Sequence, residues 1–213
     1  MSPTPTDHAA SVDFVMLYIV GISVILLLGI TSVMIYFVFK YNRKKGHAPV
    51  DIHGNIWLEI IWIVIPTALV LSMFYFGYTS FREIRDIPAN PFIVKVTARM
   101  WQFSFEYPNG KKTDTLYVPI NTPVKLELRS VDVNHAFWIP AFRIKEDVIG
   151  GKTNFLYFTA RETGSYDVAC AEYCGLKHSA MYTKINVLQD SLFTLWYGGR
   201  PEMGVNNKVK SEK

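Results

Sequence analysis

The segment Cys170-Ala171-Glu172-Tyr173-Cys174-Gly175-Leu176-Lys177-His178-Ser179-Ala180-Met181 contains both cysteines of the chain. Within these twelve residues it offers two thiolates, one imidazole and one thioether, with a carboxylate between the two thiolates. Soft sulfur ligands combined with imidazole select copper, zinc or iron–sulfur clusters, and a methionine nearby favours copper. The segment therefore predicts a copper site.

A second histidine, His135, lies upstream in the segment DVNHAFWIP, residues 132–140. Copper electron-transfer domains bring a distant histidine of this kind to a loop that holds cysteine, histidine and methionine. From Phe92 onward, short segments rich in β-branched and aromatic residues alternate with turn sequences. The candidate strands are residues 92–98, 101–107, 115–118, 124–130, 144–148, 154–159, 165–169 and 181–187. Seven or eight short strands in about 100 residues predict an all-β Greek-key sandwich or barrel.

Two apolar runs precede this domain. Phe14 to Phe39 is a run of 26 residues without a charge, and Ile60 to Tyr78 is a second run of 19. As helices they would be about 39 Å and 28 Å long, enough to cross the apolar core of a bilayer. Core helices of soluble proteins seldom lack a polar face, so the runs predict two transmembrane helices. Half of all residues are hydrophobic and the mean hydropathy is +0.15, as expected for a membrane-anchored chain.

The charges that flank the two runs predict their orientation. The loop between the runs, up to the expected start of the second span at about residue 57, has four cations and one acid, which are Lys40, Arg43, Lys44, Lys45 and Asp51. Residues 1–13 contain no lysine or arginine. The positive-inside rule therefore places the loop in the cytoplasm, and the N-terminus and the β domain on the outer face. A cleaved signal peptide is disfavoured, because a basic n-region is missing and the apolar run is about twice the usual length.

These boundaries divide the chain into five parts. An outer polar lead, residues 1–13, precedes a transmembrane hairpin, residues 14–80, with spans at about 14–39 and 57–79. A connector, residues 81–91, leads into the copper domain, residues 92–188. The C-terminal extension, residues 189–213, contains a candidate helix at 190–197 and a basic tail. The net charge of +4 is mild and its signs are interleaved, so no nucleic-acid partner is expected.

Taken by themselves, the two cysteines also fit a disulfide, a zinc site or a mononuclear copper site. A disulfide is common in exported domains, but it requires neither His178, Met181 nor Glu172. A Cys2His2 zinc site accepts this cysteine spacing but does not need the methionine. A mononuclear copper site needs one cysteine and would leave the second thiol idle. Met181 by itself is also a common kind of core residue.

The chain resembles subunit II of haem–copper cytochrome c oxidase. The resemblance rests on the run Cys-x-Glu-x-Cys-x3-His-x2-Met, on Asp-Val-x-His-x-Phe-Trp-x-Pro upstream and on the aromatic segment 101–107. Together with the helical hairpin, it covers the chain from the first span to about residue 188. It implies a cupredoxin-like fold that holds a dinuclear copper centre, CuA.

The resemblance also implies which residues would hold the copper. Cys170 and Cys174 would bridge both ions, and His135 and His178 would each supply an imidazole to one of them. The weak axial ligands would be Met181 and the main-chain carbonyl of Glu172. Two shared thiolates would spread one unpaired electron over both ions, so little geometry would change on oxidation, as in mononuclear blue copper.

Further roles follow from the same resemblance. Trp101 would be the exposed indole through which electrons enter. The side chain of Glu172 would help to hold a magnesium or manganese ion at the interface with subunit I, since a hard ion suits a carboxylate. Glu59, at the start of the second span, would mark the mouth of a proton pathway, because an ionisable residue at membrane depth is functional by default. Glu106 and Asp132 would form an acidic docking patch for cytochrome c.

Together these roles imply the electron-accepting copper subunit of a proton-pumping cytochrome c oxidase in a respiratory membrane. Electrons from cytochrome c would reach haem in subunit I, where oxygen is reduced, and a subunit III is expected in the complex. The sequence has no Cys-x-x-Cys-His motif, so haems are expected in the partner only. The alternatives are a membrane-tethered copper-binding or assembly protein, subunit II of a nitric oxide reductase with the same centre, and a quinol oxidase subunit II.

Overall fold

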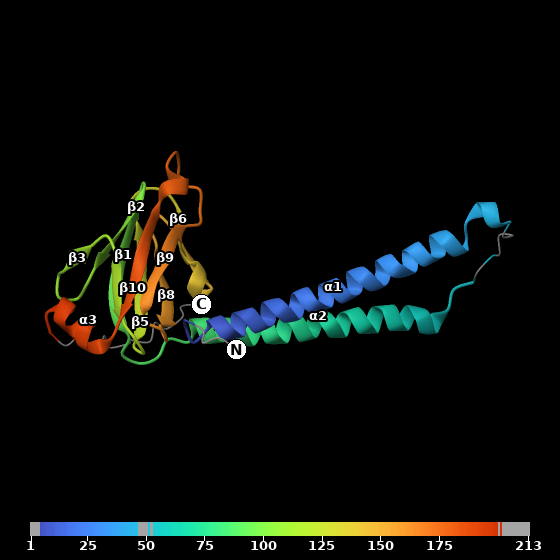
Figure 1. Cartoon of the computed structure of the whole chain (residues 1–213), viewed down its shortest axis with the longest axis horizontal. Coiled ribbons are helices and arrows are strands. Elements are labelled where there is room, and N and C mark those ends of the chain that lie inside the picture. The colour runs from blue at the N-terminus through green and yellow to red at the C-terminus, as the bar shows by residue number, and fades with distance from the viewer. Residues whose placement is uncertain (1–4, 47–50, 52, 200, 202–213) are drawn as a thin grey trace. The chain divides into compact units, whose positions relative to one another are not determined.

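The chain divides into two compact units. The computed structural model describes residues 5–46, 51, 53–199 and 201 (Figure 1). One unit comprises residues 11–81, and the other comprises the described parts of residues 1–10 and 82–213. The basic tail predicted at the C-terminus lies outside the described residues.

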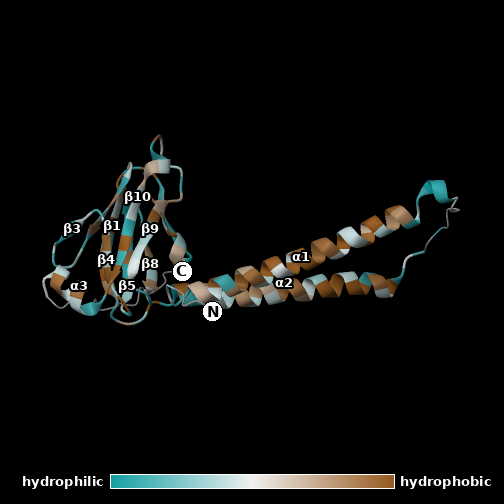
Figure 2. Ribbon diagram, viewed as in Figure 1, coloured by the Kyte–Doolittle hydropathy of each residue, from teal (hydrophilic) through white to brown (hydrophobic). Residues whose placement is uncertain are grey.

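The first unit is a pair of long apolar helices. α1 runs from Ala9 to Lys40 and α2 from Ile56 to Arg85, and a 3-10 turn, η1 (Arg43–Lys45), lies in the loop between them. The helices have 32 and 30 residues and are apolar enough to cross a membrane. Hydrophobic residues occur along most of both helices, as the brown colour in Figure 2 shows, and most of their side chains are exposed. α1 begins five residues before the predicted span and α2 ends six residues after it, so helix continues into the predicted lead and connector.

Local hydrogen bonds define the start of α2 and join the two helices. The side-chain oxygen of Asn55 accepts hydrogen bonds from the backbone N–H groups of Trp57 (3.0 Å) and Leu58 (3.3 Å). Such a cap satisfies donors that the first helical turn would leave unpaired. The hydroxyls of Tyr18 and Ser72 share a hydrogen bond of 2.7 Å, which pairs two polar groups between otherwise apolar helices.

The second unit is a sandwich of two five-stranded sheets, one with the order β3-β2-β1-β5-β8 and the other with β4-β10-β9-β6-β7. The strands are β1 (Phe92–Arg99), β2 (Gln102–Glu106), β3 (Lys112–Thr113), β4 (Leu116–Pro119), β5 (Pro123–Ser130), β6 (His135–Ile139), β7 (Ile144–Val148), β8 (Thr153–Thr159), β9 (Gly164–Cys170) and β10 (Tyr182–Leu188). The pairs β1/β5 and β4/β10 are parallel, and the other neighbours are antiparallel. The prediction of a helical hairpin followed by an all-β sandwich is confirmed.

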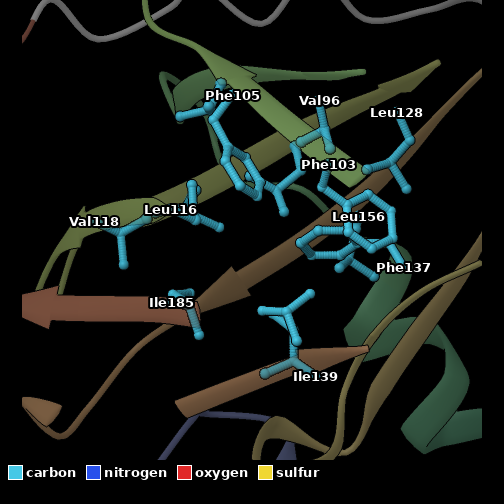
Figure 3. Close-up of a cluster of buried hydrophobic side chains, with 14 of the residues drawn as sticks. Val96, Phe103, Phe105, Leu116, Val118, Leu128, Phe137, Ile139, Leu156 and Ile185 are labelled. Atoms are coloured by element: carbon cyan, nitrogen blue, oxygen red, sulfur yellow. The ribbon is translucent and has the colours of Figure 1, made fainter. Parts of the chain in front are cut away.

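Alternation of buried and exposed residues explains how the two sheets form one core. In β1 every second side chain, from Phe92 to Ala98, is buried, and the residues between them face outward. Side chains from both sheets meet between the layers, among them Phe103 and Phe105 of one sheet and Phe137 of the other (Figure 3). Burying each large apolar side chain stabilises the fold by about 1.5–3 kcal/mol.

The observed strands and the short C-terminal helix can be compared with those predicted from the sequence. β3 and β6 are strands that the sequence pattern did not predict. Every residue of β6 except Trp138 is buried, so its period-2 signal is weak. The predicted strand 101–107 begins one residue later, because Trp101 lies in the turn between β1 and β2. The candidate helix at 190–197 is α3 (Asp190–Tyr197).

Candidate metal centre

Strand ends bring the predicted ligands to one end of the sandwich. β6 begins at His135, and β9, its antiparallel neighbour, ends at Cys170. The loop then returns to β10, where the backbone N–H of Cys170 donates to the carbonyl of Met181 (3.1 Å). A short 3-10 helix in this loop, η3 (His178–Ala180), begins at His178. The backbone N–H of His178 donates to the carbonyl of Gly175 (3.0 Å). Gly175 has a φ of 116°, a conformation that favours glycine.

The donor atoms of these residues form a series of short contacts. The sulfur atoms of Cys170 and Cys174 are 3.7 Å apart, and both cysteines are free. Nδ1 of His135 lies 3.8 Å from the sulfur of Cys170, and Nδ1 of His178 lies 3.6 Å from that of Cys174. The thioether sulfur of Met181 is 3.7 Å from the sulfur of Cys174. Imidazoles therefore lie at both ends of the series, with the two thiols between them.

Glu172 is the sixth residue of the group and makes its fifth contact. Its carbonyl oxygen lies 3.3 Å from the sulfur of Cys170, and the residue as a whole is exposed. The structure thus brings together all six residues that were predicted as copper ligands.

These separations suit metal binding. A tetrahedral ion with bonds of about 2.0–2.3 Å keeps its donors about 3.3–3.8 Å apart. The distances between neighbouring thiol, imidazole and thioether donors are 3.6–3.8 Å, so they fit such an ion. Donor atoms of His135, Cys170 and Cys174 all lie within 4.8 Å of one another, and His178 is outside this group. The four donors of His135, Cys170, Cys174 and His178 are therefore not gathered as closely as one tetrahedral ion would hold them.

Asp132 holds the imidazole of His135 in place. Its Oδ1 lies 2.8 Å from Nε2 of His135, which leaves Nδ1 of the fully buried ring facing Cys170. Metal-binding histidines commonly donate their second N–H to a carboxylate in this way. Although burial favours the neutral acid, hydrogen bonds from His135 and from the backbone N–H groups of Met100 and Val133 lower the pKa of Asp132 to about 2. The carboxylate is therefore ionised at neutral pH.

The spacing Asp-x-x-His was a sequence signal from which this contact between Asp132 and His135 could have been predicted. The sequence assigned Asp132 to partner docking, and the structure shows an inward role that was missed. Its other oxygen accepts the backbone N–H of Met100 (2.6 Å), the residue before Trp101. Asp132 thus links the two turns that flank the candidate metal centre.

Replacement of Asp132 by asparagine should lower copper affinity by about 10–100-fold, the usual effect of losing an outer partner of a metal ligand. Asparagine keeps the shape but loses the charge that fixes the His135 ring. Affinity is measured by competition with a chelator of known strength. Asp147→Asn is the matched control, since Asp147 is half-exposed and pairs with Lys145. Equal affinity in both variants would contradict the positioning role.

The metal-free centre holds at least one protonated thiol. Burial raises the pKa of the Cys174 thiol to about 11, and the hydrogen bond and charge of Cys170 act in the same direction. Because metals bind the thiolate, loading of this centre must release that proton.

Trp101 lies against the ligand loop. A Cβ atom added to Gly175 would lie 3.4 Å from the indole nitrogen of Trp101, and the ammonium of Lys177 lies 5.8 Å from the indole ring centre. The indole nitrogen is buried and has no hydrogen-bond partner among the described residues. The structure therefore places Trp101, which is half-buried, beside the loop that holds the candidate ligands, and its role in electron entry stays a prediction.

Glu106 and Glu59 are not part of this group of ligands. Glu106 ends β2 and pairs with Lys112 at 3.2 Å. It is five residues along the strand from Trp101, about 17 Å at 3.4 Å per residue. Glu59 is in the first turn of α2, in the helical unit. The docking role of Glu106 and the proton role of Glu59 stay predictions.

Comparison with known proteins gives two family matches that together cover most of the chain. The family described as cytochrome c oxidase subunit II, transmembrane domain, matches residues 1–82. The family described as cytochrome c oxidase subunit II, periplasmic domain, matches residues 111–188.

Individual relatives agree with these matches. Cytochrome c oxidase subunit 2 of Alkalihalophilus pseudofirmus is 34% identical over 85% of this chain, a match that spans 56% of that relative's length. Alternative cytochrome c oxidase subunit 2 of Bradyrhizobium diazoefficiens is 31% identical, with 76% of this chain and 70% of the relative covered. The crystal structure of the periplasmic domain of subunit II of cytochrome oxidase from Bradyrhizobium japonicum aligns with 53% of this chain and 95% of that domain. Its TM-score is 0.50 and its identity 31%.

Proposed function

Because the chain belongs to the cytochrome c oxidase subunit II family, we propose that its outer domain binds a dinuclear copper centre and accepts electrons from cytochrome c. The chain is a membrane protein with two spans, followed by a periplasmic domain. In this proposal the electrons continue to haem in subunit I of a proton-pumping oxidase, where oxygen is reduced to water.

The observation that carries the proposal is the position of the two free thiols. Their sulfur atoms are 3.7 Å apart, and each has its own imidazole and its own weak oxygen or thioether donor nearby. A single zinc or copper ion would use three or four of these six donors. Two ions that share both thiolates would use all six. When bound, such a copper pair supplies a one-electron carrier whose geometry changes little between its oxidation states.

The residues of this chain have distinct tasks in the proposal. Cys170 and Cys174 would hold the metal as thiolates after losing their protons, and His135 and His178 would each supply an imidazole nitrogen. Asp132 holds the His135 ring by its Nε2 hydrogen, which fixes the tautomer that leaves Nδ1 free. Trp101 presents an aromatic surface that contacts the ligand loop. Burial of both thiols excludes water from the sulfur atoms.

Partners outside this chain complete the proposed reaction. Subunit I would receive electrons and supply the remaining ligands of a magnesium or manganese ion beside the Glu172 carboxylate. The exposure of Glu172 makes this side chain available to a partner. A hard carboxylate suits that ion better than it suits copper. A subunit III is a further expected component.

Metal analysis of the purified full chain tests the proposal. After loading with excess copper and removal of unbound metal, we expect two copper ions per chain and a purple colour. Zinc should not displace this copper at equal concentration, since copper stands above zinc in affinity order. One zinc ion per chain and no bound copper would overturn the proposal.

Glu59→Gln should slow proton uptake by the assembled oxidase several-fold, because glutamine cannot release or accept the proton at the mouth of the proposed pathway. The measurement is the rate of proton uptake after reduction of the complex, followed with a pH indicator dye. Asp51→Asn is the matched control in the loop that precedes α2. A wild-type rate in Glu59→Gln would remove the proton role from this residue.

A further inference from the structure

Four cations lie on the loops around the candidate metal ligands or on the strand ends beside them. These loops, with the adjoining strand residues, are residues 99–102, 129–134, 149–153 and 171–181. The cations, called the basic rim below, are Arg99, Arg129, Lys152 and Lys177, and all four are exposed. The same loops contain two acids, Asp132 and Glu172.

Strand register places the basic rim near Trp101. Lys177 lies over the indole ring at 5.8 Å, and Arg99 is two residues before Trp101 in the chain. Arg129 on β5 is opposite Thr97 of β1, so it is a diagonal neighbour of Arg99 on the outward face of that sheet. Lys152 precedes Thr153, which pairs with Arg129 across the sheet.

The charges of the basic rim are not neutralised by the domain itself. None of its four cations forms an ion pair with another residue in the described part of the chain. Elsewhere on the domain several exposed lysines are paired, as Lys145 is with Asp147 and Lys184 with Asp167. The surface around the indole is therefore rich in unpaired positive charge.

The acids of the same loops, Asp132 and Glu172, offset only part of this charge, because four cations stand against them. Asp132 accepts hydrogen bonds from His135 and from the backbone of Met100, so its carboxylate is already engaged. Glu106 pairs with Lys112 at the other end of β2, about 17 Å along the strand from Trp101. Of the predicted docking acids, neither presents a free carboxylate next to the indole.

We propose that the basic rim docks an electron-donor protein that carries carboxylates around its own redox centre. This inference rests on the proposed electron-accepting function of the same site. Opposite charges steer encounter and orient the partner, and they raise association rates by 10–10³-fold at low ionic strength. The position of Lys177 directly over the indole favours a redox protein as the occupant, because the docked partner would be aligned with the ligand loop.

The test compares two donors of opposite charge on the copper-loaded full chain in neutral phosphatidylcholine nanodiscs. One donor is a reduced lysine-rich cytochrome c, and the other is the same cytochrome with its lysines succinylated. Stopped-flow absorbance gives the second-order rate of electron transfer for each. We expect the rate for the succinylated donor to fall as salt increases, and the rate for the lysine-rich donor to rise or stay constant.

Charge reversal at one position of the basic rim supplies the second measurement. Lys177→Glu should slow the succinylated donor about tenfold at low salt, whereas Lys95→Glu should change its rate less than about twofold. Lys95 is the matched control, since it is exposed on the same strand face, about 13 Å from Arg99.

The outcomes separate this inference from the function on which it rests. Two results would overturn the docking proposal and leave the proposed electron acceptance standing. One is electron transfer from both donors at equal rates that do not depend on salt. The other is faster transfer from the lysine-rich donor at a rate that falls as salt increases. Failure of both donors, with the copper still reduced by dithionite, would overturn electron acceptance from proteins and docking together.

Discussion

Cys170→Ser should abolish the purple absorbance of the copper-loaded chain and reduce oxidase turnover to background. Serine differs from cysteine by one atom, but its hydroxyl is a hard, weakly acidic ligand that does not replace a thiolate for copper. The sulfur of Cys170 contacts His135, Cys174 and the carbonyl of Glu172, so its loss removes a shared donor. The expected metal content falls from two copper ions per chain to at most one.

The matched control for this substitution is Ser179→Ala. Ser179 is an exposed residue of the same loop, and its replacement removes a hydroxyl near η3 without touching a donor atom. Circular dichroism of both metal-free variants shows whether the sandwich has folded. A folded Cys170→Ser variant that keeps the purple absorbance and two copper ions would contradict bridging by this sulfur.

Trp101→Ala should slow electron transfer from a donor protein by on the order of 10²-fold, since small losses of alignment between reacting groups have effects of this size. The indole lies against Gly175 of the ligand loop, so its removal leaves a gap between the surface and the metal centre. The copper spectrum should be unchanged, because the indole supplies no donor atom. Stopped-flow rates and absorption spectra of the same preparation measure both effects.

An exposed tryptophan elsewhere on the domain provides the comparison. Trp138 is 40% exposed on β6 and pairs with Lys145 across the sheet. Trp138→Ala should leave the rate within about twofold of wild type, as surface substitutions away from special features usually have small effects. If the two alanine variants transfer electrons equally fast, Trp101 has no special role.

The sequence was sufficient to predict the class of fold and to select six residues that the structure brings together, whose role as copper ligands stays a prediction. The donor residues of the loop are close in the chain, so their spacing alone limits the metals that they can bind. The apolar runs have the length of a bilayer and are free of charge, which excludes most soluble folds. Alternation in strands such as β1 is strong, because one face packs on the core and the other meets solvent.

Contacts between distant segments were harder to predict. β6 is buried on both faces at His135, Ala136 and Phe137, so it lacks the alternation that marks an exposed strand. The hydrogen bond from His135 to Asp132 depends on how the turn before β6 folds back. The contact of Lys177 with Trp101 joins two loops that are far apart in the sequence, and no local pattern encodes it.

Electron spin resonance of the oxidised, copper-loaded full chain tests the central claim most directly. If the two sulfur atoms of Cys170 and Cys174 are shared by a mixed-valence copper pair, one unpaired electron couples equally to two copper nuclei and gives a seven-line hyperfine pattern. A four-line pattern, which a single copper nucleus produces, would contradict the account.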